Sequence, residues 1–170
     1  MKIYWKKTEF HIYFKLGNDL LISDLLQKVI GIQKLYFIEA TNSTFAAAKI
    51  MLKHKCGALL VCNNLSDKSL LGIITERDLA FRVIPKDLIP RKTKVSQVMT
   101  KTVDTIHKNK SIYDAIEMMK KNGYRHLPVI DNKKIIGILS MRDLYAIANN
   151  SLVDSIKQHQ EFLYGTGYGA

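Results

Sequence analysis

The chain has 170 residues, of which 47% are hydrophobic and 24% charged, the composition of a soluble globular protein. No apolar run reaches the roughly 18 residues that a membrane span requires, and the charged N-terminus does not have the pattern of a signal peptide, so we expect a cytoplasmic protein with no membrane contact. The net charge of +11 favours polyanions such as nucleic acid, membrane headgroups or nucleotide phosphates, although a lysine-rich surface also simply keeps a protein in solution.

The N-terminal segment, residues 1–28, carries no assigned role. Within it, residues 1–20 alternate weakly between apolar and polar side chains, which predicts a strand or a hairpin arm. Apolar side chains then recur at helical spacing, which predicts a helix from Leu20 to Ile30 that Gly31 ends.

Residues 29–84 are predicted to form, in order, a strand, a helix, two strands and a second helix. The first helix should be capped by Ser43 and bury Ala47, Ala48 and Met51 on one face. The expected elements are the strand Lys34–Ile38, a helix to about Lys55, the strand Gly57–Cys62, a turn over Asn63–Ser69, the strand Leu70–Ile74, and a helix from Glu76 to about Val83.

The two cysteines, Cys56 and Cys62, lie six residues apart around one predicted strand. That spacing puts their Cα atoms roughly 20 Å apart, whereas a disulfide needs them within about 7 Å. We therefore expect two free thiols that pack as small apolar side chains.

Two prolines, Pro85 and Pro90, stand among basic residues and mark a linker over residues 85–94. Residues 95–150 then repeat the earlier plan, and residues 151–170 should form a helix and a glycine-rich tail. The predicted elements of the second repeat are the strand Thr102–Ile106, a helix capped by Ser111 with Ile112, Ala115, Ile116 and Met119 on one face, the strand Tyr124–Ile130, a turn over Asp131–Lys134, the strand Ile135–Leu139, and a helix from Arg142 to Ala148.

The two halves match residue by residue. Ser43 corresponds to Ser111 and Met51 to Met119, each 68 positions apart, while Gly72 corresponds to Gly137, 65 positions apart. The difference of three lies in the turn between the strands, where surface connections tolerate changes of length. An internal repeat of this size predicts two similar units that pack as pseudo-twofold mates.

The strongest repeated motif is a strand that runs into a helix, Gly72-Ile-Ile-Thr-Glu-Arg-Asp and Gly137-Ile-Leu-Ser-Met-Arg-Asp. A hydroxyl residue followed three places later by an aspartate is a capping-box variant, which stabilises a helix without any ligand. The same group also suits a nucleotide: the helix start and hydroxyl for phosphate, the aspartate for ribose, and Arg77 or Arg142 for phosphate oxygens. The residues alone leave both interpretations open.

Over about residues 29–150 the chain resembles tandem CBS domains, the pair known as a Bateman module. The motifs that carry the resemblance are the two just quoted, together with Gly57-Ala-Leu-Leu-Val and Arg125-His-Leu-Pro-Val. The resemblance implies an α/β (α+β) fold of two β-α-β-β-α units packed sheet to sheet. It also implies an adenine nucleotide (AMP, ADP, ATP, S-adenosylmethionine or NAD(H)) in the clefts between the repeats, and a homodimer formed through helices.

By position, the resemblance implies a role for each residue of the motifs. Asp78 and Asp143 would hold ribose, Thr75 and Ser140 phosphate. Arg125 and His126 sit where family members often place phosphate contacts, and the base would lie near Leu35 and Ile38 in one site and Val103 and Ile106 in the other. The first repeat departs from the pattern, because Gly57 and Ala58 replace Arg125 and His126 and Leu60 replaces Pro128, so the two clefts should differ in affinity.

The sequence bears on three classes of function. The leading one is a regulatory module that binds an adenine nucleotide and signals through its shape or to a separate regulated protein. An enzyme is not expected, because the sequence shows no nucleophile–base pair, no metal-ligand cluster and no phosphate loop, and no metal is predicted. The alternative is a nucleic-acid-binding protein that uses the +11 charge, although no reader motif is recognisable.

Overall fold

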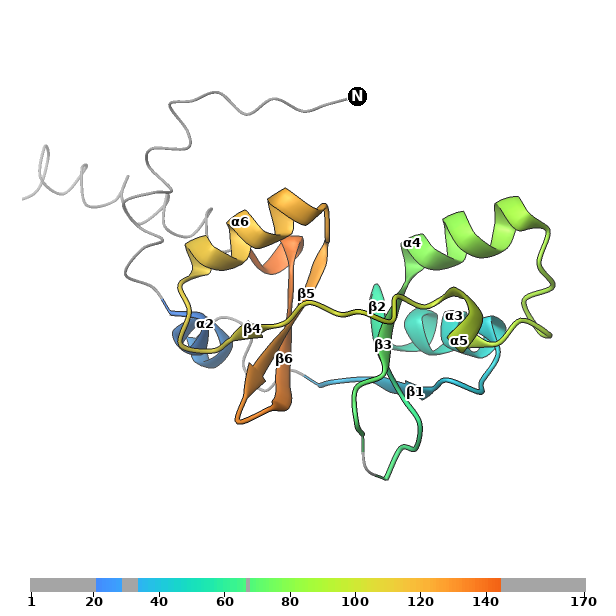
Figure 1. The fold of residues 1–170 in the computed structure, drawn as a ribbon, viewed down its shortest axis with the longest axis horizontal. Coiled ribbons are helices and arrows are strands. Elements are labelled where there is room, and N and C mark those ends of the chain that lie inside the picture. The colour runs from blue at the N-terminus through green and yellow to red at the C-terminus, as the bar shows by residue number, and fades with distance from the viewer. Residues whose placement is uncertain (1–20, 29–33, 67, 145–170) are drawn as a thin grey trace, which may run out of the picture. The chain divides into compact units, whose positions relative to one another are not determined.

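A computed structural model describes residues 21–28, 34–66 and 68–144 (Figure 1). The chain divides into two compact units. The first-repeat unit comprises residues 34–105 and 132–138, and the second-repeat unit comprises residues 1–33, 106–131 and 139–170. The strand or hairpin arm predicted over residues 1–20 and the helix and tail predicted over 151–170 lie outside the described residues.

The first-repeat unit contains a three-stranded sheet in the order β1-β2-β3. Its strands are β1 (Phe37–Glu39), β2 (Ala58–Cys62) and β3 (Gly72–Thr75). The crossover through helix α3 (Thr44–His54) makes β1 parallel to β2, whereas β3 returns antiparallel to it. Every residue of β2 is buried, as a central strand covered on both faces requires.

Helix α3 begins at its predicted cap and buries one face. The Ser43 hydroxyl accepts a hydrogen bond from the Ala46 N–H at 3.2 Å, so the predicted cap is confirmed. Ala47 and Met51 are buried as expected, but Ala48 is exposed, and Thr44 takes the third buried position instead. The expectation for Ala48 was wrong because it lies 100° around the helix from Ala47, at the edge of the face that Thr44, Ala47 and Met51 share.

The chain stays helical for eleven residues after β3, in three successive forms. A single α-turn, α4 (Glu76–Asp78), leads into the π-helical turn η1 (Leu79–Val83) and then into the 3₁₀ turn η2 (Ile84–Lys86). The helix predicted over 76–83 is therefore present but extends into the predicted linker. Pro85 lies within η2, in the first turn, where its missing N–H costs no hydrogen bond.

A short helix that the sequence analysis missed, α5 (Val95–Val98), completes this unit. Val95 and Val98 are 0% and 4% exposed and pack into the core with β2 and β3. Beyond α5 the chain pairs with the sheet, because Ile73 and Thr100 exchange two backbone hydrogen bonds at 3.0 and 2.9 Å. The approach is so close that a Cβ atom on Gly72 would lie 2.6 Å from the Thr100 carbonyl oxygen.

The second repeat has the same plan, with a sheet in the order β4-β5-β6, although residues 132–138 of its hairpin belong to the first-repeat unit. The elements of the second repeat are β4 (Ile106–His107), helix α6 (Ile112–Asn122), β5 (His126–Asp131) and β6 (Lys134–Ser140), and residues 141–144 begin the next helix. The β5–β6 hairpin turns through Asn132 and Lys133, which both have positive φ (46° and 62°). Two such residues form the tight turn that matches the twist of the strands.

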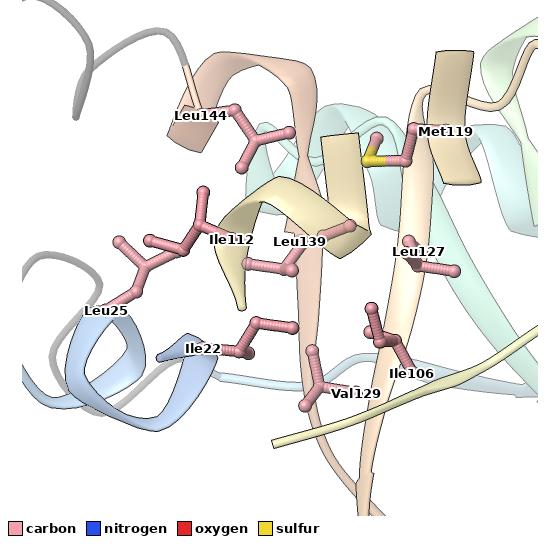
Figure 2. Packing of buried hydrophobic residues seen from close by; sticks show 10 residues of the cluster. Ile22, Leu25, Ile106, Ile112, Met119, Leu127, Val129, Leu139 and Leu144 are labelled. Carbon is pink, nitrogen blue, oxygen red and sulfur yellow. The ribbon is translucent and has the colours of Figure 1, made fainter. Parts of the chain in front are cut away.

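Helix α2 (Ile22–Lys28) supplies part of the second-repeat core, although it precedes the first repeat in sequence. Ile22 and Leu25 are 0% and 1% exposed and contact the same cluster as Leu127, Val129 and Leu139 from the sheet (Figure 2). The helix predicted over Leu20–Ile30 is thus confirmed for its described part, and its apolar face has a structural role.

The mixed α/β class and the two β-α-β-β-α units are confirmed. The boundaries of the first strands were wrong, because β1 begins at Phe37 rather than Lys34 and β4 covers Ile106–His107 rather than Thr102–Ile106. Extended residues count as strand only where they pair, and pairing to the central strand begins at those points.

Cys56 and Cys62 are both free, as predicted. Cys62 is fully buried, and its thiol donates to the Ile38 carbonyl oxygen at 3.6 Å. Burial raises the pKa of the Cys56 thiol above its usual range. None of the helices in the described ranges combines the length and the apolar character needed to span a lipid bilayer.

Candidate functional site

The start of the helix after β6 presents the hydroxyl and the carboxylate that the motif predicted. Asp143 Oδ2 accepts hydrogen bonds from the Ser140 N–H and the Ser140 hydroxyl, both at 2.7 Å. In return, the Asp143 N–H donates to Ser140 Oγ at 3.3 Å. This is a complete capping box, which contributes about 1 kcal/mol to the helix. The structural interpretation of the motif is therefore confirmed, and the question is what remains for a ligand.

One carboxylate oxygen of Asp143 is not used by the box. Within the described part of the chain, Asp143 Oδ1 accepts no hydrogen bond and joins no ion pair, and the side chain is half-buried. A carboxylate oxygen offers two lone pairs, so it can accept the hydroxyl hydrogens of a diol. The second helix start thus offers a fixed carboxylate with one unused oxygen, while the Ser140 hydroxyl and the N–H groups of Ser140, Met141 and Asp143 already donate within the chain.

The start of helix α4 has the same capping box, but its aspartate makes one further contact outside the box. Asp78 Oδ2 accepts from the Thr75 N–H and the Thr75 hydroxyl at 2.8 Å each, and the Asp78 N–H donates to Thr75 Oγ1 at 3.2 Å. Here the other oxygen, Asp78 Oδ1, lies 3.2 Å from Arg82 Nη2. Asp78 is also more buried than its counterpart, with 7% of its surface exposed.

The beginning of each central strand adjoins the helix start of its own unit. The Met141 N–H donates to the Arg125 carbonyl oxygen at 3.1 Å, and the Glu76 N–H donates to the Gly57 carbonyl oxygen at 3.0 Å. The structure therefore brings Arg125 and the first residue of β5, His126, next to Ser140. Arg125 is exposed and His126 half-buried. The first repeat has no side chain able to contact a phosphate at the equivalent positions, which are Gly57 and Ala58.

Two of the residues predicted to contact a base, Ile38 and Ile106, lie on the first strands, and Leu35 and Val103 precede those strands in sequence. In both sheets the central strand separates the first strand from the strand that leads into the helix. Ile38 and Ile106 are 2% and 3% exposed and belong to the two cores, so their side chains are already covered. Leu35 and Val103 are half-buried. The base-binding roles of all four remain predictions.

The arginines that precede the two aspartates, Arg77 and Arg142, are exposed, and their phosphate-binding roles also remain predictions. The sequence analysis did not single out Arg82. The signal was present, because Asp78 and Arg82 stand at i and i+4, the spacing at which helical side chains meet. The described residues hold no group of three or more metal-ligating side chains.

Comparisons with known proteins place these motifs in one family. The CBS domain profile matches residues 22–84 and 95–149. An uncharacterised 17.7 kDa protein of Acidianus ambivalens is 37% identical over 116 residues, which cover 68% of each chain. Other curated relatives are larger, and the chain spans between 20% and 64% of their length.

Solved structures of similar fold carry the same domain. A CBS-domain protein of Agrobacterium tumefaciens, ATU1752, is 31% identical with a TM-score of 0.68, over 75% of this chain and 98% of that one. The CBS domain pair of protein MJ0100, solved with 5′-methylthioadenosine and S-adenosyl-L-methionine, has a TM-score of 0.65 at 24% identity, over 77% and 97% of the two chains. The repeated strand–helix motifs, the two matched units and these similarities together show that the chain belongs to the CBS-domain family and carries two CBS domains in tandem.

Proposed function

We propose that this chain is a cytoplasmic regulatory module whose CBS domain pair binds an adenine nucleotide, and that binding changes its shape or its affinity for a separate regulated protein. The ligand class is AMP, ADP, ATP, NAD(H) or S-adenosylmethionine. A ligand of this kind can drive signalling only through a difference in affinity between two states of the protein.

The observation that supports this proposal best is the unused oxygen of Asp143. The capping box orients the carboxylate through Oδ2, and Oδ1 remains available to accept hydrogen bonds from ribose hydroxyls. The neighbouring Arg125 suits a phosphate, whereas the Ser140 hydroxyl, whose hydrogen Asp143 Oδ2 already accepts, would have to rotate to donate to one. The ligands of the MJ0100 domain pair, which both contain adenosine, agree with this class.

The proposal is tested by titration calorimetry on the full chain with AMP, ATP, NADH and S-adenosylmethionine, preceded by mass spectrometry of any ligand released from freshly purified protein. Asp143→Ala should weaken binding at least tenfold, because it removes the acceptor of the ribose hydroxyls. Lys133→Ala, a change in the β5–β6 turn, should have less effect on binding.

A matched control for lost capping is Asp114→Ala. Asp114 forms the same box with Ser111 at the exposed start of α6, where the Ser111 N–H donates to its Oδ2 at 3.2 Å. This variant should lose a comparable amount of helix stability and keep its affinity for nucleotide. Equal affinities of the Asp143→Ala and Asp114→Ala variants would refute the ribose assignment.

The alternative, nucleic-acid binding through the +11 charge, predicts a different response to salt. Contacts with many phosphates release counterions, so affinity for an oligonucleotide falls by orders of magnitude between 50 and 200 mM salt. Hydrogen bonds to a ribose depend on salt far less. Retention of duplex and single-stranded oligonucleotides over a salt series, next to the nucleotide titrations, therefore separates the two functions.

We also propose that the module is a homodimer. Large apolar side chains stand exposed along and after the helical run of the first repeat: Phe81 (69% exposed), Ile84 (74%) and Ile89 (57%). Burying these side chains in an interface would remove apolar surface from water, which favours association. Light scattering should give twice the mass of one chain, and Phe81→Lys should reduce it to that of one chain; a monomeric wild type would contradict this proposal.

A further inference from the structure

The carboxylate of Asp78 is fully engaged by its own chain. One oxygen, Oδ2, closes the capping box with Thr75, and the other, Oδ1, pairs with Arg82 Nη2 at 3.2 Å. The Asp78 side chain is 9% exposed, whereas the Arg82 side chain is 42% exposed, so the guanidinium stands between the carboxylate and the solvent. Both oxygens that a ribose would need are therefore already in use.

Arg82 is itself held in place from a second side. Its Nη1 donates to the Val98 carbonyl oxygen at 2.8 Å, at the end of helix α5. Val98 is buried, and the chain just beyond it is bonded to the sheet through Thr100 and Ile73. A guanidinium that donates at once to a carboxylate and to a fixed carbonyl has little freedom to leave either of them.

The second repeat lacks this arginine. The residue 65 positions after Arg82, at the place that corresponds to it, is Ile147, whose side chain cannot pair with a carboxylate. In agreement with this difference, Asp143 Oδ1 has no hydrogen-bond or ion-pair partner within the described residues. Two helix starts with the same capping box thus differ in one outer contact, which decides whether a ligand finds a free acceptor.

We propose that Arg82 blocks the first repeat by pairing with Asp78, the carboxylate that would otherwise accept the ribose hydroxyls. Each chain then binds a single adenine nucleotide, at the second repeat. This inference rests on the proposed function and assigns its stoichiometry and the residue that sets it. A ribose diol is neutral and would have to displace a charge-assisted, intramolecular partner that is present at every ligand concentration.

The start of the central strand in each sheet also favours a single nucleotide site at the second repeat. Next to Asp78 the chain has Gly57 and Ala58, which offer a nucleotide no cation, whereas Arg125 and His126 occupy these places next to Asp143. Both repeats have an exposed arginine before the aspartate, Arg77 and Arg142, so a phosphate at the first repeat would meet one cation fewer, the counterpart of Arg125, to compensate for displacing Arg82 from Asp78.

Calorimetry of the full chain with AMP, and separately with ATP, tests the inference through the number of sites. The wild type should bind one nucleotide per chain. Asp78→Asn, which keeps an acceptor for the capping box, should change the affinity less than twofold, and Asp143→Asn should reduce it at least tenfold. Arg82→Gln should expose Asp78 and raise the number of sites from one to two, whereas Arg82→Lys, which keeps a cation near Asp78, should leave it at one.

Two sites in the wild type, one of them lost in Asp78→Asn, would overturn the inference and leave the proposed function intact. A folded Arg82→Gln variant that still binds one nucleotide would also overturn it, and thermal melting followed by circular dichroism establishes whether that variant is folded. If Arg82→Gln does not fold, the pair of Asp78→Asn and Asp143→Asn still decides the matter. Absence of binding to every variant, including the wild type, refutes the proposed function itself and the inference with it.

Discussion

The starts of the two repeated helices have the same bonds inside the motif and differ only outside it. In both, a hydroxyl residue and an aspartate three places later exchange hydrogen bonds, at 2.7–2.8 Å to the carboxylate and 3.2–3.3 Å to the hydroxyl. Only Asp78 also pairs with an arginine one turn later. The comparison teaches that this motif predicts a carboxylate fixed by its own cap. Whether the second oxygen of that carboxylate is available to a ligand depends on residues outside the motif.

The largest expected difference between the two helix starts is in stability. Asp78→Ala should lower the free energy of unfolding by about 2–3 kcal/mol, because it removes a nearly buried carboxylate from the cap and leaves Arg82 without its partner. Asp143→Ala should cost about 1 kcal/mol, the usual value of a lost cap. Urea unfolding of both variants measures the two losses in stability. Equal losses would show that the pair of Asp78 with Arg82 adds nothing to the first helix start.

The second prediction concerns residues 98–100, which include the Val98 carbonyl oxygen that accepts a hydrogen bond from Arg82. Gly72→Ala should destabilise the protein by about 1–3 kcal/mol, because its Cβ would lie 2.6 Å from the Thr100 carbonyl oxygen and 2.9 Å from Met99 Sδ. Amide hydrogen exchange should then quicken at Ile73 and Thr100, whose backbone bonds tie this segment to the sheet. Unchanged exchange at both residues would show that the close approach of Gly72 to Thr100 does not control this backbone pairing.

A third, smaller effect compares the ends of the first helices of the two repeats. Helix α3 ends at Lys55 (φ 51°) and α6 at Gly123 (φ 71°), which are equivalent positions in the left-handed conformation. That conformation costs most residues about 1 kcal/mol and glycine almost nothing. Lys55→Gly should therefore raise the midpoint of thermal unfolding, and Gly123→Ala should lower it; the same sign for both would contradict the equivalence.

The smallest effect is chemical. Because burial raises the pKa of the Cys56 thiol, little thiolate forms near neutral pH, and modification by a disulfide reagent should be slower than for an exposed thiol. The rate should rise as the pH approaches and passes the raised value, since the thiolate is the reactive form. Cys62, at 0% exposure, should react only on unfolding. Rapid labelling of Cys62 in the folded protein would show that β2 is not the covered central strand.

Local signals in the sequence were sufficient to predict the repeated units and their caps. The capping boxes depend on residues three apart, so Thr75 with Asp78 and Ser140 with Asp143 could be identified without any tertiary information. The hairpin over Asn132 and Lys133 was likewise set by neighbouring residues.

Features that depend on distant partners could not be predicted. Helix α5 has four residues, too few for a periodic pattern, and its burial comes from packing against the sheet of the first repeat. The limits of β1 and β4 depend on where the central strand offers a partner. The bond from Arg82 to the Val98 carbonyl joins residues 16 apart, so its effect on Asp78 became visible only in three dimensions.

The contribution of α2 to the core around Leu127 and Leu139 has a consequence for the order in which the protein matures. The residues that pack around β2, from Tyr36 to Met99, are all synthesised before residue 127 exists, so the first repeat can fold on the ribosome while Ile22 and Leu25 still lack their partners. Until the later strands emerge, those two side chains cannot be buried against their native partners.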